Sequence, residues 1–182
     1  MDYYPAFLDA SEADPLFKHL HLHLPWIQGQ VKVFGKIYDE PRLSLWMGDA
    51  GYTYAGVPRE PAAWDDRVRQ LAERLSRFCG CEFNSVLLNL YRNGHDAMGM
   101  HRDNEKELGP TPCIASLSLG ASRYFDFRHL TTAQKYRIDL GHGDLVVMHG
   151  DTQRDYKHGV PRQKRIEAPR INLTFRRIYA TH

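Results

Sequence analysis

No stretch of the sequence approaches the roughly 20 consecutive apolar residues that a membrane-spanning helix needs, so we expect no membrane partner. Cysteine is also scarce, and its three residues are too few and odd in number for a disulfide framework. No apolar leader precedes the polar residues 9–14. We therefore expect a reducing, cytoplasmic location. Cys79-Gly80-Cys81 is interpreted as a structural feature at a helix end and not as a metal site.

Net charge is small as well, at +2 with a pI near 8.4. This mild basic excess permits a polyanionic partner without requiring one. Late in the chain five basic residues gather: Arg154, Lys157, Arg162, Lys164 and Arg165. They could contact nucleic-acid phosphates or could form a solvated face, and the sequence favours neither. With 182 residues the chain can bury a core of its own, and we expect a monomer.

Two helices are predicted in the first half, over residues 11–24 and 64–78. The second has one apolar stripe, formed by Val68, Leu71, Leu75 and Phe78. After residue 83 short alternating runs separated by turns follow one another, at 83–91, 113–119, 123–128, 136–140, 145–149 and 170–178. This pattern predicts a mostly β chain with flanking helices (α+β), built on a β-sandwich or jelly roll.

One domain is expected over residues 1–182. Within it, residues 1–60 would form an N-terminal helix and a flap that includes two short strands, 30–36 and 42–47. The jelly-roll core would cover residues 83–182.

His101-Arg102-Asp103 closes the stretch in which the chemistry is expected. On an extended strand, alternate side chains leave the same face, so His101 and Asp103 could bind one metal ion. His158 would complete a set of two histidines and one carboxylate, the facial triad of non-haem Fe(II) oxygenases. Alone this pattern is weak, because the chain has ten histidines. Other histidines compete for the third position, namely His129, His142 and His149.

The segment 169–176 carries a second pattern. Strand periodicity sends Arg170, Asn172, Thr174 and Arg176 to one face and three apolar residues to the other. If the polar face points into a barrel, the two arginines must meet anions there, because a buried unpaired guanidinium is very costly. A dicarboxylic acid would serve, since arginine holds carboxylates bidentately. The alternative is an edge strand whose arginines face solvent.

From about Val31 to the C-terminus the sequence resembles the AlkB family of Fe(II)- and 2-oxoglutarate-dependent dioxygenases. The order and spacing of four motifs carry the resemblance: Asn-Leu-Tyr at 89–91, His-Arg-Asp at 101–103, Ala-Ser-Leu-Ser-Leu-Gly-Ala at 115–121 and Pro-Arg-Ile-Asn-Leu-Thr-Phe-Arg at 169–176. The resemblance implies a double-stranded β-helix (jelly roll) and the cofactors Fe(II), 2-oxoglutarate and O₂. It implies iron on His101, Asp103 and His158 as catalytic residues. The implied ligands of 2-oxoglutarate are Asn89, Tyr91, Arg170 and Arg176, with Asn172 and Thr174 nearby.

The activity that the resemblance implies is oxidative dealkylation of N-alkylated bases in DNA, that is, repair of alkylation damage. The products would be succinate, CO₂ and an aldehyde. An enzyme of this kind must flip a base out of the duplex or act on single strands. The N-terminal segment would then be a nucleotide-recognition flap, with substrate contacts from Val33, Phe34, Gly35, Lys36 and Tyr54. In this interpretation Phe34 wedges into the base stack and Tyr54 lines the pocket opposite His101, although both could simply pack the flap.

Asn104 and Glu105 are the remaining predicted substrate contacts. Duplex-acting relatives carry an acidic pair here, and Asn104 can donate as well as accept hydrogen bonds. In this comparison the chain is also shorter than those relatives after Tyr54. Two alternatives therefore stay open: the same chemistry on RNA or on a protein side chain, and a non-catalytic jelly roll that binds metal or nucleic acid.

Overall fold

The computed structural model describes residues 1–33, 35–49, 52–54, 57–59 and 61–179. For residues 32, 33, 52–54 and 57–59 it describes the backbone alone. Helices are α1 (Ala10–His23), α2 (Asp66–Cys79), the short α3 (Thr152–Asp155) and the 3-10 turn η1 (Lys106–Leu108). Strands are β1 (Asp2–Tyr4), β2 (Ile27–Val33), β3 (Lys36–Gly48), β4 (Tyr52–Tyr54), β5 (Val57–Arg59), β6 (Ser85–Tyr91), β7 (Met98–His101), β8 (Ile114–Gly120), β9 (Arg123–His129), β10 (Lys135–Leu140), β11 (Leu145–Met148), β12 (Tyr156–Val160) and β13 (Arg170–Arg176).

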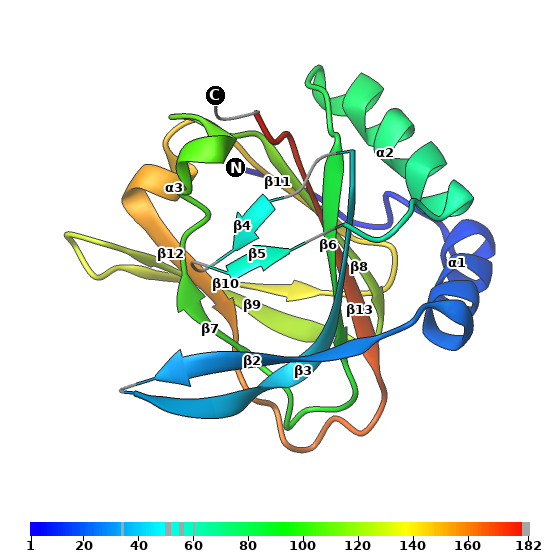
Figure 1. Ribbon diagram of the computed structural model, residues 1–182, viewed down its shortest axis with the longest axis horizontal. Coiled ribbons are helices and arrows are strands. Elements are labelled where there is room, and N and C mark those ends of the chain that lie inside the picture. Colours follow the sequence, from blue (N-terminus) through cyan, green and yellow to red (C-terminus); the bar gives the residue numbers. More distant parts are fainter. Residues whose placement is uncertain (34, 50–51, 55–56, 60, 180–182) are drawn as a thin grey trace.

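Two antiparallel sheets make the body of the molecule, as Figure 1 shows. In the described part of the chain the major sheet has seven strands in the order β1-β11-β8-β13-β6-β3-β2. The minor sheet has four, in the order β10-β9-β12-β7, and β4 and β5 form a separate pair. This is the jelly roll that the sequence predicts. Strands β1, β2 and β3 join the major sheet, so the predicted flap segment 1–60 also extends the core sheet.

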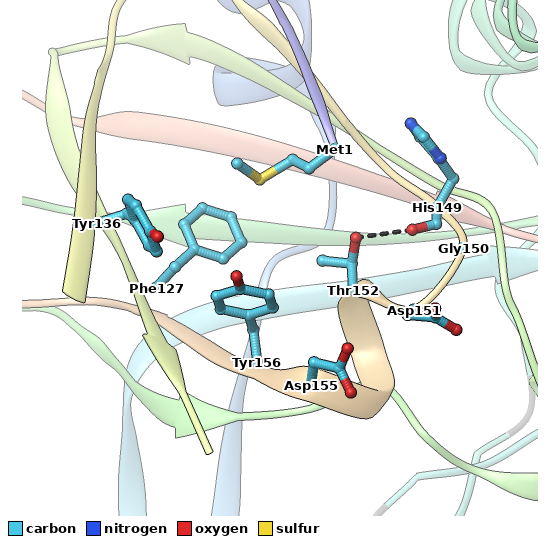
Figure 2. A pocket seen from close by; sticks show the side chains of 9 residues that line it. All are labelled: Met1, Phe127, Tyr136, His149, Gly150, Asp151, Thr152, Asp155 and Tyr156. Carbon is cyan, nitrogen blue, oxygen red and sulfur yellow. Dashed lines mark hydrogen bonds between the residues drawn. The ribbon is translucent and has the colours of Figure 1, made fainter. Parts of the chain in front are cut away.

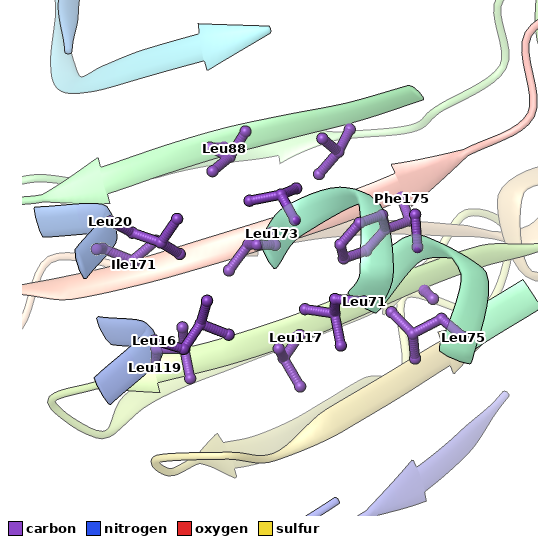
Figure 3. Packing of buried hydrophobic residues seen from close by; sticks show 14 of the residues in the cluster. Leu16, Leu20, Leu71, Leu75, Leu88, Leu117, Leu119, Ile171, Leu173 and Phe175 are labelled. Atoms are coloured by element: carbon purple, nitrogen blue, oxygen red, sulfur yellow. The ribbon is translucent and has the colours of Figure 1, made fainter. Parts of the chain in front are cut away.

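A hydrophobic core fills the space between the helices and the outer face of the major sheet. Leu71 and Leu75 of α2 and Leu16 and Leu20 of α1 point toward the sheet (Figure 3). The side chains that pack against them from the sheet are Leu88, Leu117, Leu119, Ile171, Leu173 and Phe175. A second core lies between the two sheets and includes Tyr91, Phe125, Phe127, Met148 and Val160. The helices therefore support the major sheet from outside and leave its inner face for the site.

Local signals explain where the helices begin and end. The Asp9 and Asp65 carboxylates accept hydrogen bonds from backbone N–H groups in the first turns of α1 and α2. Gly80 ends α2 with φ of +66°, a left-handed conformation that glycine adopts without strain. Phe78, at the end of the predicted apolar stripe, is 48% exposed and packs on the rings of Tyr4 and Phe7.

Several strands differ from their predicted bounds. The predicted strand 30–36 is β2, which ends at Val33, and 42–47 is part of the longer β3. β12, which carries His158, is not among the predicted strands, because it has only five residues and they are mixed in polarity. β7 ends at His101, so Asp103 lies beyond the strand on which it was expected. Among the described residues, no helix is long and apolar enough to cross a membrane.

We expect Leu173→Ala to lower the free energy of unfolding by about 2–5 kcal/mol, because the substitution leaves a cavity under the helices. Leu173 is fully buried. Leu22→Ala is the control, since Leu22 is 63% exposed and its loss should change stability by no more than about 0.5 kcal/mol. Urea unfolding followed by circular dichroism measures both, and equal losses would contradict this account of the core.

Candidate metal centre

Three predicted ligands converge between the two sheets. β7 and β12 are neighbours in the minor sheet, and their register places His101 directly opposite His158, with ring centroids 4.4 Å apart. Asp103 follows β7 and turns back toward them. Ligand atoms of these three residues, here called the metal triad, all lie within 4.8 Å of one another. Two nitrogens and one oxygen at this spacing are the donor set that suits Fe(II).

Burial and neighbouring charges hold two residues of the metal triad in the protonation states that bind a metal. Burial would raise the pKa of Asp103, but the charge of Arg176, followed by the two histidines, lowers that pKa to about 2. Arg176 donates to Asp103 Oδ2 at 2.8 Å, while Oδ1 faces His101 Nε2 at 3.8 Å. Burial, and then the nearby charge of His101, lowers the pKa of His158 to about 3. An ionised carboxylate and a neutral imidazole at neutral pH are the forms that a metal requires.

Backbone contacts orient the ligands. His101 Nδ1 lies 2.9 Å from the carbonyl oxygen of Gly99, which fixes the ring and turns Nε2 toward Asp103. The Asp103 N–H donates to Gln153 Oε1 at 3.0 Å. His158 Nδ1 is buried without a hydrogen-bond partner among the described residues. The His158 ring lies beside a second imidazole and a carboxylate, an arrangement that fits a metal ligand.

The inner face of β13 forms the floor of the adjoining cavity. Its register with β6 sets Arg170 opposite Tyr91 and Asn172 opposite Asn89. Residues that line the space, here called the co-substrate cavity, are Leu87, Asn89, Tyr91, Met98, His101, Asp103, Ser116, Phe125, Met148, His158, Val160, Arg170, Asn172, Thr174 and Arg176. The predicted polar face of 170–176 therefore points inward. Ile171, Leu173 and Phe175 point to the helices, as expected.

Arg170 and Arg176 are not equivalent. Arg176 is bound to Asp103, so its first role is to hold a metal ligand. Arg170 is 1% exposed, and its Nη2 donates to Ser118 Oγ at 2.7 Å. Its Nε and Nη1 have no hydrogen-bond partner in the described part of the chain. Burial lowers its pKa to about 10, so the guanidinium stays charged at neutral pH. A buried cation with two open donors fits a carboxylate of 2-oxoglutarate.

Among the other predicted co-substrate ligands, Asn172 and Thr174 form hydrogen bonds within the protein, whereas Tyr91 supports Arg170. Asn172 is satisfied internally: Nδ2 donates to Ser116 Oγ at 2.8 Å, and Oδ1 accepts from Thr174 at 2.8 Å. This pair therefore shapes the cavity wall. Tyr91 lies under Arg170, whose guanidinium carbon is 5.3 Å from the ring centroid. Such stacking stabilises the cation where water is excluded.

Asn89 is held by Arg42, which is itself paired with Glu40, and neither of these buried residues is among the predicted site residues. Arg42 Nε donates to Asn89 Oδ1 at 2.9 Å, and Arg42 pairs with Glu40 at 3.1 Å. Glu40 is 2% exposed and Arg42 6%. With its oxygen engaged, Asn89 has its amide NH₂ left for the cavity that it lines. The alternation of polar and apolar residues along β3 places Glu40 and Arg42 on the same face, which is the pattern that could have indicated them. Charged residues at such positions, however, usually face solvent.

The predicted substrate contacts that the structure describes do not line the co-substrate cavity. Phe34 lies outside the described residues, as do the side chains of Val33 and Tyr54. Gly35 stands at the turn between β2 and β3, and Lys36 begins β3 with an exposed side chain. Asn104 is exposed and Glu105 is half-buried. Neither is among the described residues that line the co-substrate cavity, and their substrate role stays a prediction.

A roomier hollow of about 440 Å³ lies near the start of β12 and is drawn in Figure 2. Phe127, Tyr136 and Tyr156 gather on one side of it, and Asp151 and Asp155 on the other. Both carboxylates are bound to the exposed Arg154. This hollow lacks the metal triad and an open guanidinium, so size alone does not mark the reactive site.

Comparison with known proteins agrees with this geometry. The family model of the 2OG-Fe(II) oxygenase superfamily matches residues 1–176. The chain belongs to that superfamily. It is 40% identical over 186 residues to alpha-ketoglutarate-dependent dioxygenase alkB homolog 3 of Homo sapiens, covering 97% of this chain and 65% of that protein. It is 39% identical over 191 residues to DNA oxidative demethylase ALKBH2 of Mus musculus, covering 98% and 80%. These relatives place it in the AlkB family.

The solved structure of OsALKBH1 is similar in fold, with a TM-score of 0.62, 16% identity and coverage of 96% of this chain and 95% of that one. Fe(II), 2-oxoglutarate and O₂ are the cofactors of the superfamily, and the donor set of the metal triad fits the iron. The assignment of single residues to iron and 2-oxoglutarate stays a prediction. The chain spans about two thirds of the length of the alkB homolog 3 relatives.

Arg170→Met should weaken 2-oxoglutarate binding by roughly 30-fold or more, because a charge-assisted contact to a buried carboxylate contributes about 2–5 kcal/mol. Anaerobic titration with Fe(II) present, followed through the metal-to-ligand absorption band, measures the affinity. His101→Ala should lack the band altogether. Arg128→Gln, at an exposed arginine, is the matched control. Equal affinities for Arg170→Met and the control would remove Arg170 from the co-substrate site.

Proposed function

We propose that the protein removes alkyl groups oxidatively from N-alkylated bases in DNA and so repairs alkylation damage. The observation that carries this proposal is the metal triad beside a buried, open guanidinium in a chain 39% identical to a DNA oxidative demethylase. A metal site alone would serve a simple binder. The additional cation inside the co-substrate cavity is costly to bury without an anion, and this supports the uptake of a dicarboxylate.

Each element of the site has a chemical task in this proposal. His101, Asp103 and His158 hold Fe(II), and Arg170 holds the distal carboxylate of 2-oxoglutarate. When bound, Fe(II), 2-oxoglutarate and O₂ supply the oxidation of the alkyl carbon, with succinate, CO₂ and an aldehyde as products. The apolar wall, with Leu87 and Val160, limits water around the reacting groups.

The outer face of the minor sheet supports a polyanionic partner. Register places Lys157 of β12, Arg128 of β9 and Lys135 of β10 side by side across three strands, and all three are exposed. Like charges directly opposite one another destabilise a sheet. None of the three has an ion-pair partner among the described residues. This set, here called the basic row, matches the phosphate backbone of a nucleic acid.

The basic residues that the sequence offers for phosphate contact differ in whether a carboxylate compensates their charge. Arg154 is bound to Asp151 and Asp155, so its charge is largely compensated. Lys164 and Arg165 are exposed and stay candidates, whereas Lys157 gains its importance from its neighbours on the sheet. The basic row could not be found from chain order, because its members are 22 or more residues from Lys157 along the sequence.

The enzymatic test is release of formaldehyde from N-methylated oligonucleotides. We expect release from single-stranded or duplex DNA that depends on Fe(II), 2-oxoglutarate and O₂, and that Asp103→Ala abolishes. Methylated RNA is the parallel arm. Release from RNA alone would assign the chemistry to that polymer. Succinate formation without release from any nucleic acid would contradict the proposed substrate while keeping the oxygenase.

The contribution of the basic row can be tested separately. The triple substitution of Arg128, Lys135 and Lys157 by Gln should weaken binding of unmodified DNA and reduce the salt slope by about 2–3, because each phosphate contact releases a counterion. Arg77→Gln is the control, since Arg77 is exposed on α2, across the major sheet from the minor sheet (Figure 1). Fluorescence anisotropy at several salt concentrations measures both. An unchanged slope would exclude the basic row from the footprint.

A further inference from the structure

Two buried arginines contact the same aromatic ring beside the co-substrate cavity. Tyr91 ends β6 and Arg170 begins β13 in the major sheet, whereas Arg123 begins β9 in the minor sheet. The guanidinium carbon of Arg123 is 5.6 Å from the centre of the Tyr91 ring, and that of Arg170 is 5.3 Å from the same centre. Both arginines are only 1% exposed. The structure therefore brings a second cation close to the arginine that faces the cavity.

The hydrogen bonds of the Arg123 guanidinium in the described part of the chain all go to neutral oxygens. Nε donates to Gln163 Oε1 at 3.1 Å and Nη1 to the Asn93 carbonyl oxygen at 3.1 Å. Nη2 donates to the carbonyl oxygens of Asp96 at 2.8 Å and Pro161 at 2.7 Å. These oxygens satisfy the donors, but they carry no formal charge, so the guanidinium stays a cation without a paired anion.

Among the described residues, no carboxylate forms an ion pair with Arg123 or Arg170. The Asp96 carboxylate is itself bound by Arg92 at 2.8 Å, so it offsets the charge of Arg123 only in part. Two buried cations near one another are costly. Their mutual effect is felt at Arg170, whose pKa is lowered first by burial and further by the charge of Arg123.

A structural role explains the bonds of Arg123 but not the place of its charge. The bonds join residues 93–96 to residues 161–163, and arginine suits such a clamp because it has five donors. The clamp does not require the cation to contact the same ring as Arg170, where each charge raises the cost of the other. An anion with two charges in the adjoining cavity would lower the cost of both.

We propose that Arg123 is a specificity-determining residue of the co-substrate cavity, whose charge favours a dianionic 2-oxo acid over a monoanionic one. This inference rests on the proposed role of Arg170 in holding the distal carboxylate. Tyr91 lines the cavity and Arg123 does not, so Arg123 acts through its electric field and not by contact. Such a field is effective here because water, which would screen it, is scarce around these buried side chains.

Two ligands that differ by one charge test the proposal: 2-oxoglutarate, and 2-oxopentanoate, in which a methyl group replaces the distal carboxylate. Anaerobic titration of the full chain with Fe(II) present, followed through the metal-to-ligand absorption band, gives both dissociation constants and hence the preference for the dianion. Arg123→Gln should reduce this preference roughly tenfold, the size expected for one unit charge at an effective dielectric constant of about 20. Arg123→Lys keeps the charge and should keep most of the preference.

A matched variant separates the charge from the clamp. Gln163→Ala removes one acceptor of Arg123 and leaves the cation in place. It should lower the midpoint of thermal unfolding without changing the preference between the two ligands. Arg77→Gln removes one positive charge at an exposed position on α2 and should leave both the midpoint and the preference unchanged.

An unchanged preference in Arg123→Gln, or an equal loss in Arg123→Lys, would overturn the proposal. Arg123→Met removes the same charge and decides the matter if Arg123→Gln fails to fold. Arg170→Met distinguishes the two levels of the argument. If it binds 2-oxoglutarate as tightly as the unaltered chain, the proposed co-substrate site fails. If it loses affinity while Arg123→Gln keeps the full preference, only the role of Arg123 fails.

Discussion

The Asp103 carboxylate connects the two sheets of this molecule. It is 1% exposed, its Oδ2 is bound by Arg176 of the major sheet, and its Oδ1 faces His101 of the minor sheet. Removing either partner of a buried pair leaves an uncompensated charge and costs about 3–5 kcal/mol. The geometry of the metal triad is therefore tied to the packing of the sheets, because opposite charges meet between them.

The same constraint separates the roles of the two arginines. Both lie on the inner face of β13, where water is scarce and a lone guanidinium is costly. Arg176 is compensated by the protein itself, whereas among the described residues Arg170 contacts a serine and an aromatic ring but no carboxylate. A cavity that holds one open cation next to a metal triad is organised for an anionic co-substrate. The unequal pairing also explains why strand periodicity could find both residues without distinguishing them.

Much of this site could be predicted from the sequence, because strand periodicity is a local property. Alternation along 170–176 predicts which side chains face inward, and turns and apolar runs predict most strands of the jelly roll. Long-range pairing is the part that escapes a local signal. Nothing near Arg42 indicates that Asn89 is its partner, and nothing near Asp103 indicates Arg176. The basic row likewise exists only after three strands adopt their register.

A final contribution comes from Gly159, which follows the metal-triad residue His158. The pairing of β12 with β7 shifts register here, between His158 and Val160. A Cβ atom at position 159 would lie 2.8 Å from the carbonyl oxygen of Met98 and 3.0 Å from that of Gly99. Any side chain would push β7 away from β12, since backbone atoms cannot yield as a flexible side chain can. Because the two histidines face each other across these strands, the absence of a side chain at Gly159 sets the distance between two metal ligands.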